Sequence, residues 1–179
     1  MGLRKQIREF FYLKIRKLTL SDVRILQLKR NGTIVGENCF LFSDELETTE
    51  PYLVSIGDGV TIAAGVRFAT HDDSSEYYLG RGNLATGRIT IGNDVFIGMG
   101  SLILPGVSIA DRCIIGAGSV VTHSVREEGT VIAGNPARPI GTVEALKEKN
   151  KEKAIYVGDL PFQEKKELLL RQEHQFIIR

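Results

Sequence analysis

The stretch "IGNDVFIGMGSLILPGVSIADRCIIGAGSVV", residues 91–121, carries a branched apolar residue at every sixth position. The repeating residues are Ile91, Ile97, Ile103, Ile109, Ile115 and Val121. Four positions after each stands a small or β-branched residue, in the order Val95, Ser101, Val107, Cys113, Ser119 and Val125. A period of six fits neither an amphipathic helix nor a simple hairpin meander. It is typical of a chain coiled into stacked short strands, in which each coil buries its apolar residues against its neighbours.

The same period extends towards the N-terminus, where Ile56, Ile62 and Phe68 continue it and Val35 and Leu41 begin it. Residues 68–73 form one unit and 85–90 resume the register, so residues 74–84 are read as an inserted loop. Loops inserted into a regular solenoid commonly carry function. His71 stands at the root of this loop, which makes it the first candidate for chemistry.

Composition limits the class of protein. The chain has 179 residues, 19 of them Gly, and its 23 basic and 22 acidic side chains give a net charge of +1. This balance gives no support for a nucleic-acid partner. No apolar stretch approaches the roughly 20 residues of a membrane span, and the N-terminus lacks a signal-peptide pattern. We therefore expect a cytoplasmic protein of one domain.

The two ends of the chain differ from the repeat. The first 20 residues carry six Lys or Arg against one Glu, with apolar residues at roughly helical spacing. A helix packed over the end of the core is the simpler expectation, and peripheral membrane contact through this basic segment stays open. The predicted organisation is a helical segment at 1–32, a β-helix at 33–126 with the inserted loop 74–84, and an exit loop with a helical tail at 127–179.

Longer motifs resemble a known family. "IGNDVFIGMGSLILPGVSIADRCIIGAGSVVTHSV", followed by "VIAGNPARPIG", resembles the hexapeptide-repeat acyltransferases. "PYLVSIGDGVTIAAGVRFATHDDSS" is similar to the branch of O-acetyltransferases acting on sugars, polysaccharides and some antibiotics. The resemblance covers roughly residues 33–142. It implies a mainly β protein, a left-handed parallel β-helix with short terminal helical segments. It also implies a homotrimer with acetyl-CoA in clefts between subunits, and a catalytic His at the base of a protruding loop, here His71.

The resemblance also implies a set of cofactor-binding residues. Backbone groups near Met99 and Ala117 would bind the pantetheine amides, and Thr122, His123 and Arg138 would lie towards the nucleotide phosphates. The family often has Lys at the position of His123 and a second His at the position of Asp73.

The coil of the family has three sides. Counting 50–55 as a unit, the hexads beginning at 68, 97 and 115 fall on one side. His71, Met99 and Ala117 would then share one edge, on successive coils about 4.8 Å apart.

The chemistry implied for His71 is that of a general base. A neutral imidazole takes the proton of an acceptor hydroxyl as the oxygen attacks a thioester, and no covalent enzyme intermediate is needed. Asp72 or a backbone carbonyl is expected to fix the tautomer of the ring. Cys39 and Cys113 fall in the small inward column, so we read them as buried packing residues rather than nucleophiles.

Three alternatives remain beside an O-acetyltransferase. An amino-sugar N-acetyltransferase differs only in its acceptor, and a non-catalytic hexapeptide-repeat assembly protein would need no His-bearing loop. A γ-type carbonic anhydrase shares the fold but needs three His for its zinc, and the spacing of the three histidines disfavours it. We therefore predict no metal site and a small-molecule or glycan acceptor.

Overall fold

The computed structural model describes residues 18–42 and 49–173. It separates into two compact units, Met1–Val143 and Glu144–Arg179, which are described separately. The basic segment at residues 1–17 lies outside the described residues, and so does its expected helix.

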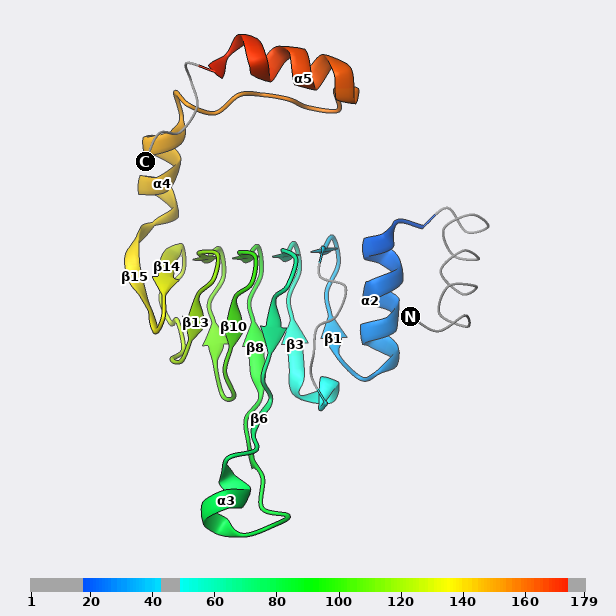
Figure 1. The fold of residues 1–179 in the computed structure, drawn as a ribbon, viewed down its shortest axis with the longest axis vertical. Coiled ribbons are helices and arrows are strands. Elements are labelled where there is room, and N and C mark those ends of the chain that lie inside the picture. The colour runs from blue at the N-terminus through cyan, green and yellow to red at the C-terminus, as the bar shows by residue number, and fades with distance from the viewer. Residues whose placement is uncertain (1–17, 43–48, 174–179) are drawn as a thin grey trace. The chain divides into compact units, whose positions relative to one another are not determined.

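The first unit is a coil of short strands that form three parallel sheets (Figure 1). Sheet 1 contains β1 (Ile34–Val35), β3 (Val54–Ile56), β8 (Ile89–Ile91) and β11 (Ser108–Ile109). Sheet 2 contains β2 (Phe40–Leu41), β4 (Thr61–Ile62), β9 (Phe96–Ile97), β12 (Ile114–Ile115) and β14 (Thr130–Gly134), with β15 (Ala137–Thr142) at its edge. Sheet 3 contains β5 (Arg67–Phe68), β10 (Leu102–Ile103) and β13 (Val120–Val121). From β3 to β13, apart from the hairpin described below, successive strands belong to successive sheets, so the chain winds as a three-sided parallel β-helix.

The six-residue period produces the core. The repeating residues from Ile56 to Val121 are all at most 2% exposed, and each large apolar side chain contributes about 1.5–3 kcal/mol when fully buried. The column of small residues is also buried from Val95 to Ser119, and its polar members find partners. The Ser101 hydroxyl, for example, lies 2.8 Å from the Gly98 carbonyl oxygen and 3.0 Å from that of Gly116. Cys39 and Cys113 are free and buried, which confirms their reading as packing residues.

Helix α2 (Leu20–Arg30) covers the first coil. Thr19 caps it, since its hydroxyl accepts from the Asp22 N–H while the Asp22 carboxylate accepts from the Thr19 N–H. Val23 is buried, and Ile25 and Leu28 pack against the core. The helix is therefore held by its apolar face, and Lys29 and Arg30 in its last turn are exposed.

The last coil ends in a hairpin where the sequence predicted an exit loop. β14 pairs in parallel with β12, and β15 then returns antiparallel to β14. The coil extends this far because Ile132 takes the place next to Ile115 and is itself 3% exposed.

The second unit contains most of α4 (Val143–Asn150) and all of α5 (Phe162–Arg171). Within the described ranges, no helix has the length and apolar character needed to cross a membrane.

A second hairpin leaves the coil after β5 and protrudes from it (Figure 1). It consists of β6 (His71–Asp72), the short helix α3 (Ser75–Leu79) and β7 (Ala85–Thr86), with His71 opposite Thr86.

The position of this hairpin changes the assignment of the six-residue units to the three sides of the coil. Phe68 pairs with Ile103 in sheet 3, whereas Ile97 and Ile115 belong to sheet 2. The prediction that the hexads at 68, 97 and 115 share a side is therefore wrong. The count included residues 85–90 as a full side, but residues 85–86 form the returning arm of the hairpin, and the next side of the coil is β8.

Candidate active site

His71 is placed by the point at which the hairpin leaves the coil. Phe68 anchors the preceding strand in the core. The Gly87 N–H donates to the Thr70 carbonyl over 2.9 Å, which closes the base of the hairpin. A Cβ at Gly87 would collide with the backbone of Gly106 on the next coil, so this crossing requires glycine. The imidazole therefore lies at the root of the hairpin, beside the coil, with 19% of its side chain exposed.

Glu50 holds one nitrogen of the ring. His71 Nδ1 lies 2.6 Å from Glu50 Oε2, and the same oxygen accepts from the Thr70 hydroxyl over 2.6 Å. Thr49 Oγ1 lies 3.1 Å from Nδ1. Glu50 immediately precedes the 3₁₀ turn η2 (Pro51–Leu53), and only 16% of its side chain is exposed. Because carboxylates only accept, Nδ1 carries a proton in this contact.

This pairing changes the ionisation of both partners. The hydrogen bond to Glu50 raises the pKa of His71, with a smaller contribution from Asp73 and an opposing one from burial. The Thr70 hydroxyl, and after it His71, lowers the pKa of Glu50. The two directions agree and describe an ionised carboxylate that stabilises a protonated imidazole.

Asp72 does not orient the ring, so the expectation that Asp72 or a backbone carbonyl does so is wrong. The Asp72 Oδ1 atom accepts from the Ser74 N–H over 2.9 Å and belongs to the turn of the hairpin. Glu50 was missed because it is 21 residues from His71 in a stretch where the repeat is irregular. The available signal was that the Glu50 carboxylate lies at a second irregularity of the six-residue period, in the stretch 50–55.

Asp73 lies on the other side of the ring. His71 Nε2 is 3.2 Å from Asp73 Oδ1, and 83% of the Asp73 side chain is exposed. The imidazole is thus placed between one fixed, half-buried carboxylate and one exposed carboxylate.

Met99 and Ala117 lie on a different edge from His71. They occupy successive coils, with the Gly118 N–H donating to the Met99 carbonyl over 2.8 Å, and both are exposed. They follow strands of sheet 2 and precede strands of sheet 3, whereas His71 follows sheet 3 and precedes sheet 1. The expectation that the three residues share an edge of one chain is therefore wrong.

Thr122 and His123 lie on the same edge as His71, in the turn between β13 and Val125, which bridges to Ile109 of sheet 1. The Thr122 hydroxyl lies 2.8 Å from His123 Nδ1. Thr122, His123 and His71 therefore follow strands of the same sheet.

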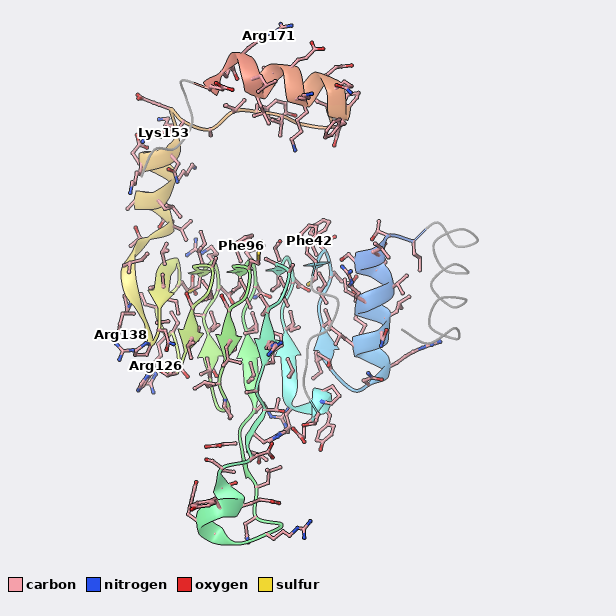
Figure 2. All side chains as sticks on the ribbon, viewed as in Figure 1. Phe42, Phe96, Arg126, Arg138, Lys153 and Arg171 are labelled. Carbon is pink, nitrogen blue, oxygen red and sulfur yellow. The ribbon has the colours of Figure 1, made fainter. Side chains whose placement is uncertain are left out.

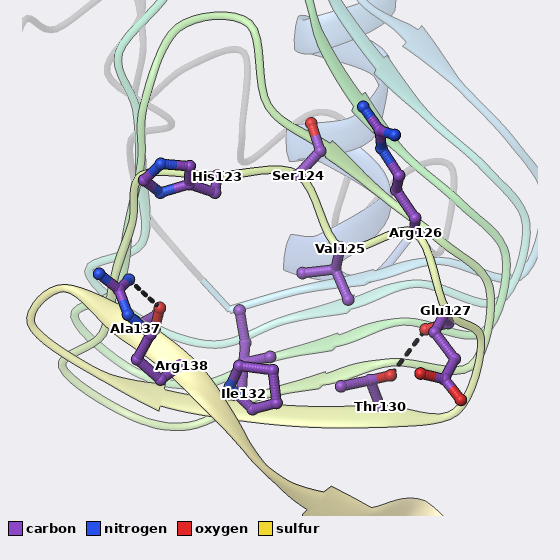
Figure 3. A pocket seen from close by; sticks show the side chains of 10 residues that line it. His123, Ser124, Val125, Arg126, Glu127, Thr130, Ile132, Ala137 and Arg138 are labelled. Carbon is purple, nitrogen blue, oxygen red and sulfur yellow. Dashed lines mark hydrogen bonds between the residues drawn. The ribbon is translucent and has the colours of Figure 1, made fainter.

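His123 and Arg138 line a pocket of about 520 Å³ at the end of the coil (Figure 3). Val125, Ile132 and Ala137 supply apolar walls, and Arg126 adds a second guanidinium. Figure 2 shows Arg126 and Arg138 at this end of the coil. Sequence reasoning missed Arg126, although the basic residue directly follows the last position of the small column.

The rest of the described chain offers no competing centre of reactive side chains. Burial raises the pKa of both the Cys39 and the Cys113 thiols, which makes them poor nucleophiles. Among residues 18–42 and 49–173, no three His, Cys, Asp or Glu side chains form a group that could hold a metal ion. His174 lies outside the described residues.

Comparison with known proteins identifies the family. Residues 88–123 match the family described as bacterial transferase hexapeptide (six repeats). The chain is 44% identical over 167 residues to protein CapG of Staphylococcus aureus, covering 90% of this chain and 94% of that protein. The fold is similar to that of a maltose O-acetyltransferase from Clostridium difficile 630, with 28% identity, a TM-score of 0.54, and coverage of 69% and 76% of the two chains.

A hexapeptide-repeat acetyltransferase from Vibrio cholerae O1 biovar eltor, solved in complex with acetyl-CoA, is also similar. Its TM-score is 0.51 and its identity 28%, over 62% of this chain and 60% of that chain. The hexapeptide repeat and these folds imply that the three-sided coil is left-handed. The chain belongs to the hexapeptide-repeat acyltransferase family.

Proposed function

We propose that this acyltransferase is an acetyl-CoA-dependent O-acetyltransferase that modifies a hydroxyl of a sugar or polysaccharide precursor, with His71 as the general base. The observation that carries the proposal is the imidazole at the root of the hairpin, held through Nδ1 by the Glu50 carboxylate at 2.6 Å. The likeness to a maltose O-acetyltransferase supports the hydroxyl acceptor, and the Vibrio cholerae complex supports the donor.

The geometry suits proton transfer. When the ring is neutral, Glu50 keeps the remaining proton on Nδ1, so that Nε2 is the nitrogen that accepts a proton. An acceptor hydroxyl within hydrogen-bond reach of Nε2 gives up its proton to the ring as its oxygen attacks a carbonyl carbon. Glu50 then stabilises the imidazolium that forms, because its charge lies against Nδ1–H.

The residues at the end of the coil fit the nucleotide part of the donor. When bound, acetyl-CoA supplies an acetyl thioester whose thiolate is a good leaving group. The pocket of about 520 Å³ has apolar walls, and His123 and Arg138 line it. Arg138 would pair with a phosphate, since a guanidinium makes strong charge-assisted hydrogen bonds to phosphate oxygens. Backbone groups at Met99 and Ala117 would hold the pantetheine arm.

The placement of Met99 and Ala117 supports a homotrimer. They flank one side of sheet 3 and His71 flanks the other, so the two sets do not meet on one edge of a chain. In our proposal, the edge of one subunit that carries His71 lies against the edge of its neighbour that carries Met99 and Ala117. Each active site then contains residues of two chains.

The test is thiol release from acetyl-CoA across a panel of methyl hexopyranosides and amino sugars. We expect release with a hydroxyl acceptor, and we expect His71→Ala to lower kcat about 10²–10⁴-fold, the range for removing one acid–base group. The affinity for acetyl-CoA should remain nearly unchanged, because the ring faces the acceptor.

Two outcomes would contradict this proposal. If His71→Ala retained more than a third of the wild-type turnover, His71 would not be the general base. Release with amines alone would replace the hydroxyl acceptor by an amino sugar.

A further inference from the structure

The Asp73 carboxylate occupies the place that an acceptor must take. Its Oδ1 atom lies 3.2 Å from His71 Nε2, the ring nitrogen that Glu50 does not bind. In the described part of the chain, this carboxylate makes no other ion pair or hydrogen bond. A hydroxyl that approaches Nε2 therefore meets Asp73 first.

The backbone of Asp73 keeps the carboxylate close even when Oδ1 leaves the ring. The Asp73 carbonyl accepts from the Glu76 N–H over 3.1 Å, which ties it to the first turn of α3. The neighbouring Ser75 is fully buried, and its hydroxyl lies 2.6 Å from the Asp72 carbonyl oxygen. Only the short, 83% exposed side chain of Asp73 is free to rotate. Rotation places the carboxylate beside the incoming hydroxyl rather than far from it.

A carboxylate beside His71 Nε2 favours some acceptors over others through its hydrogen bonding and its charge. Ionised carboxylates accept hydrogen bonds and do not donate, so Asp73 favours an acceptor with a second donor next to the reacting hydroxyl. A neighbouring phosphate or carboxylate on the acceptor would be repelled, because like charges at close range are unfavourable. A neutral sugar with adjacent hydroxyls meets both conditions.

We propose that Asp73 is a specificity-determining residue that accepts a hydrogen bond from a hydroxyl adjacent to the one that is acetylated, so that the enzyme prefers vicinal diols. This inference rests on the proposed O-acetyltransferase function and names its substrate class. When the acceptor binds, the Asp73 carboxylate moves away from the His71 ring and accepts a hydrogen bond from the adjacent hydroxyl. The hydroxyl to be acetylated then contacts Nε2.

The experiment compares the best methyl hexopyranoside of the panel with its monodeoxy analogues, each lacking one hydroxyl beside the acetylated position. In the wild type, we expect the loss of that hydroxyl to lower kcat/KM about 10- to 100-fold, the scale of a charge-assisted hydrogen bond. In Asp73→Ala, the diol and its analogue should react at nearly equal kcat/KM, and Asp73→Asn should retain part of the preference.

A matched control and a second readout accompany this comparison. Glu76→Gln alters another carboxylate of the hairpin, one that accepts from the Gly82 N–H, and should keep the preference for the diol. An NMR titration of the His71 ring should give a lower pKa in Asp73→Asn than in the wild type, whether or not acceptor is present.

The outcomes separate the two proposals. A ratio of diol to analogue that is the same in Asp73→Ala as in the wild type would overturn the role of Asp73 and leave the O-acetyltransferase intact. Failure of the wild type to release thiol with any acceptor would overturn the proposed function, and the diol preference with it.

Discussion

At the scale of single residues, one oxygen atom connects the His71 ring to the body of the coil. Glu50 Oε2 receives both the Thr70 hydroxyl and the His71 ring, each at 2.6 Å. The Thr70 bond keeps the carboxylate ionised and in place, so that its charge is available when the ring gains a proton. In our proposal Glu50 is therefore a positioning residue, and its effect is measurable through the titration of His71.

We expect Glu50→Gln to lower turnover about 10- to 100-fold, since a charged hydrogen bond contributes about 1.5–3 kcal/mol. The wild-type kcat/KM should fall as the pH drops through the raised pKa of His71, because the protonated ring cannot act as a base. Removing the Glu50 charge lowers that pKa, so the acidic limb of the profile should move to lower pH. Steady-state kinetics as a function of pH will measure both effects.

The control for this prediction is Glu37→Gln, which removes a surface carboxylate that lies 3.6 Å from Lys29. It should leave the profile unchanged, and Glu50→Asp should recover part of the lost rate. An acidic limb at the same pH in Glu50→Gln as in the wild type would exclude Glu50 from the site.

Arg138 provides a second prediction at this scale. Arg138→Ala should weaken CoA binding about 10- to 100-fold through loss of a charged hydrogen bond, with the coil intact because the side chain is exposed. Calorimetric titration with CoA measures the effect. Arg112→Ala, which removes an exposed partner of Glu128 outside the pocket, should leave the affinity within twofold of the wild type. An unchanged affinity for CoA in Arg138→Ala would show that Arg138 does not bind a phosphate of CoA.

The residues of the site differ in how far the sequence predicted them. His71 followed from its place at an interruption of the period and from the motif around it. Glu50 did not, because its contact with His71 joins two segments that are 21 residues apart in the chain. The six-residue period identifies the side chains that form the core. It does not identify which residue contacts a side chain, such as that of His71, that lies where the period is interrupted.

At the scale of elements, the strands were predictable because one rule produces all of them. A branched residue at every sixth position requires an inward side chain on each side of the coil, and every repeating residue from Ile56 to Val121 is buried. The sides were miscounted because residues 85–90 continue the period by spacing alone. β14 and β15 were missed because Ile132 falls outside the six-residue spacing.

The hairpin that bears His71 depends on the buried Ser75 hydroxyl. It lies 2.6 Å from the Asp72 carbonyl oxygen and 2.9 Å from that of Asn83, and it accepts from the Ala85 N–H over 2.8 Å. Ser75→Ala should leave these backbone groups unsatisfied, at a local cost of about 1–3 kcal/mol. We expect faster hydrogen exchange at Ala85 and reduced turnover, with little change in the Tm of the coil.

Tyr77→Ala is the matched control for the hairpin, since this side chain on α3 is 96% exposed. It should leave exchange at Ala85 as in the wild type. Equal exchange in Ser75→Ala and the wild type would show that other contacts hold the hairpin.

At the scale of the whole molecule, the proposed distribution of the site over two edges of the chain leads us to expect a homotrimer. Light scattering should give about three times the chain mass of 19.8 kDa. A monomer that retains full turnover would rule out an active site shared between chains.

A mixing experiment tests the shared site directly. His71→Ala and Ala117→Glu should each be inactive as pure proteins, the second because a carboxylate at an exposed corner would obstruct the pantetheine arm. Refolded together, the two chains should regain measurable turnover, since some interfaces then combine an intact His71 edge with an intact Ala117 edge. Turnover no higher than that of the separate variants would place each site within one chain.

The cover that α2 gives the first coil also bears on solubility. Strands at the open end of a β-helix present unpaired backbone groups, which are templates for association with other chains. α2 occupies such groups on β2, because the Leu41 N–H donates to the Ser21 hydroxyl over 2.9 Å and the Leu41 carbonyl accepts from Arg24 over 2.9 Å. We therefore expect that removal of this helix would leave the Leu41 groups unpaired and promote end-to-end association of one coil with another.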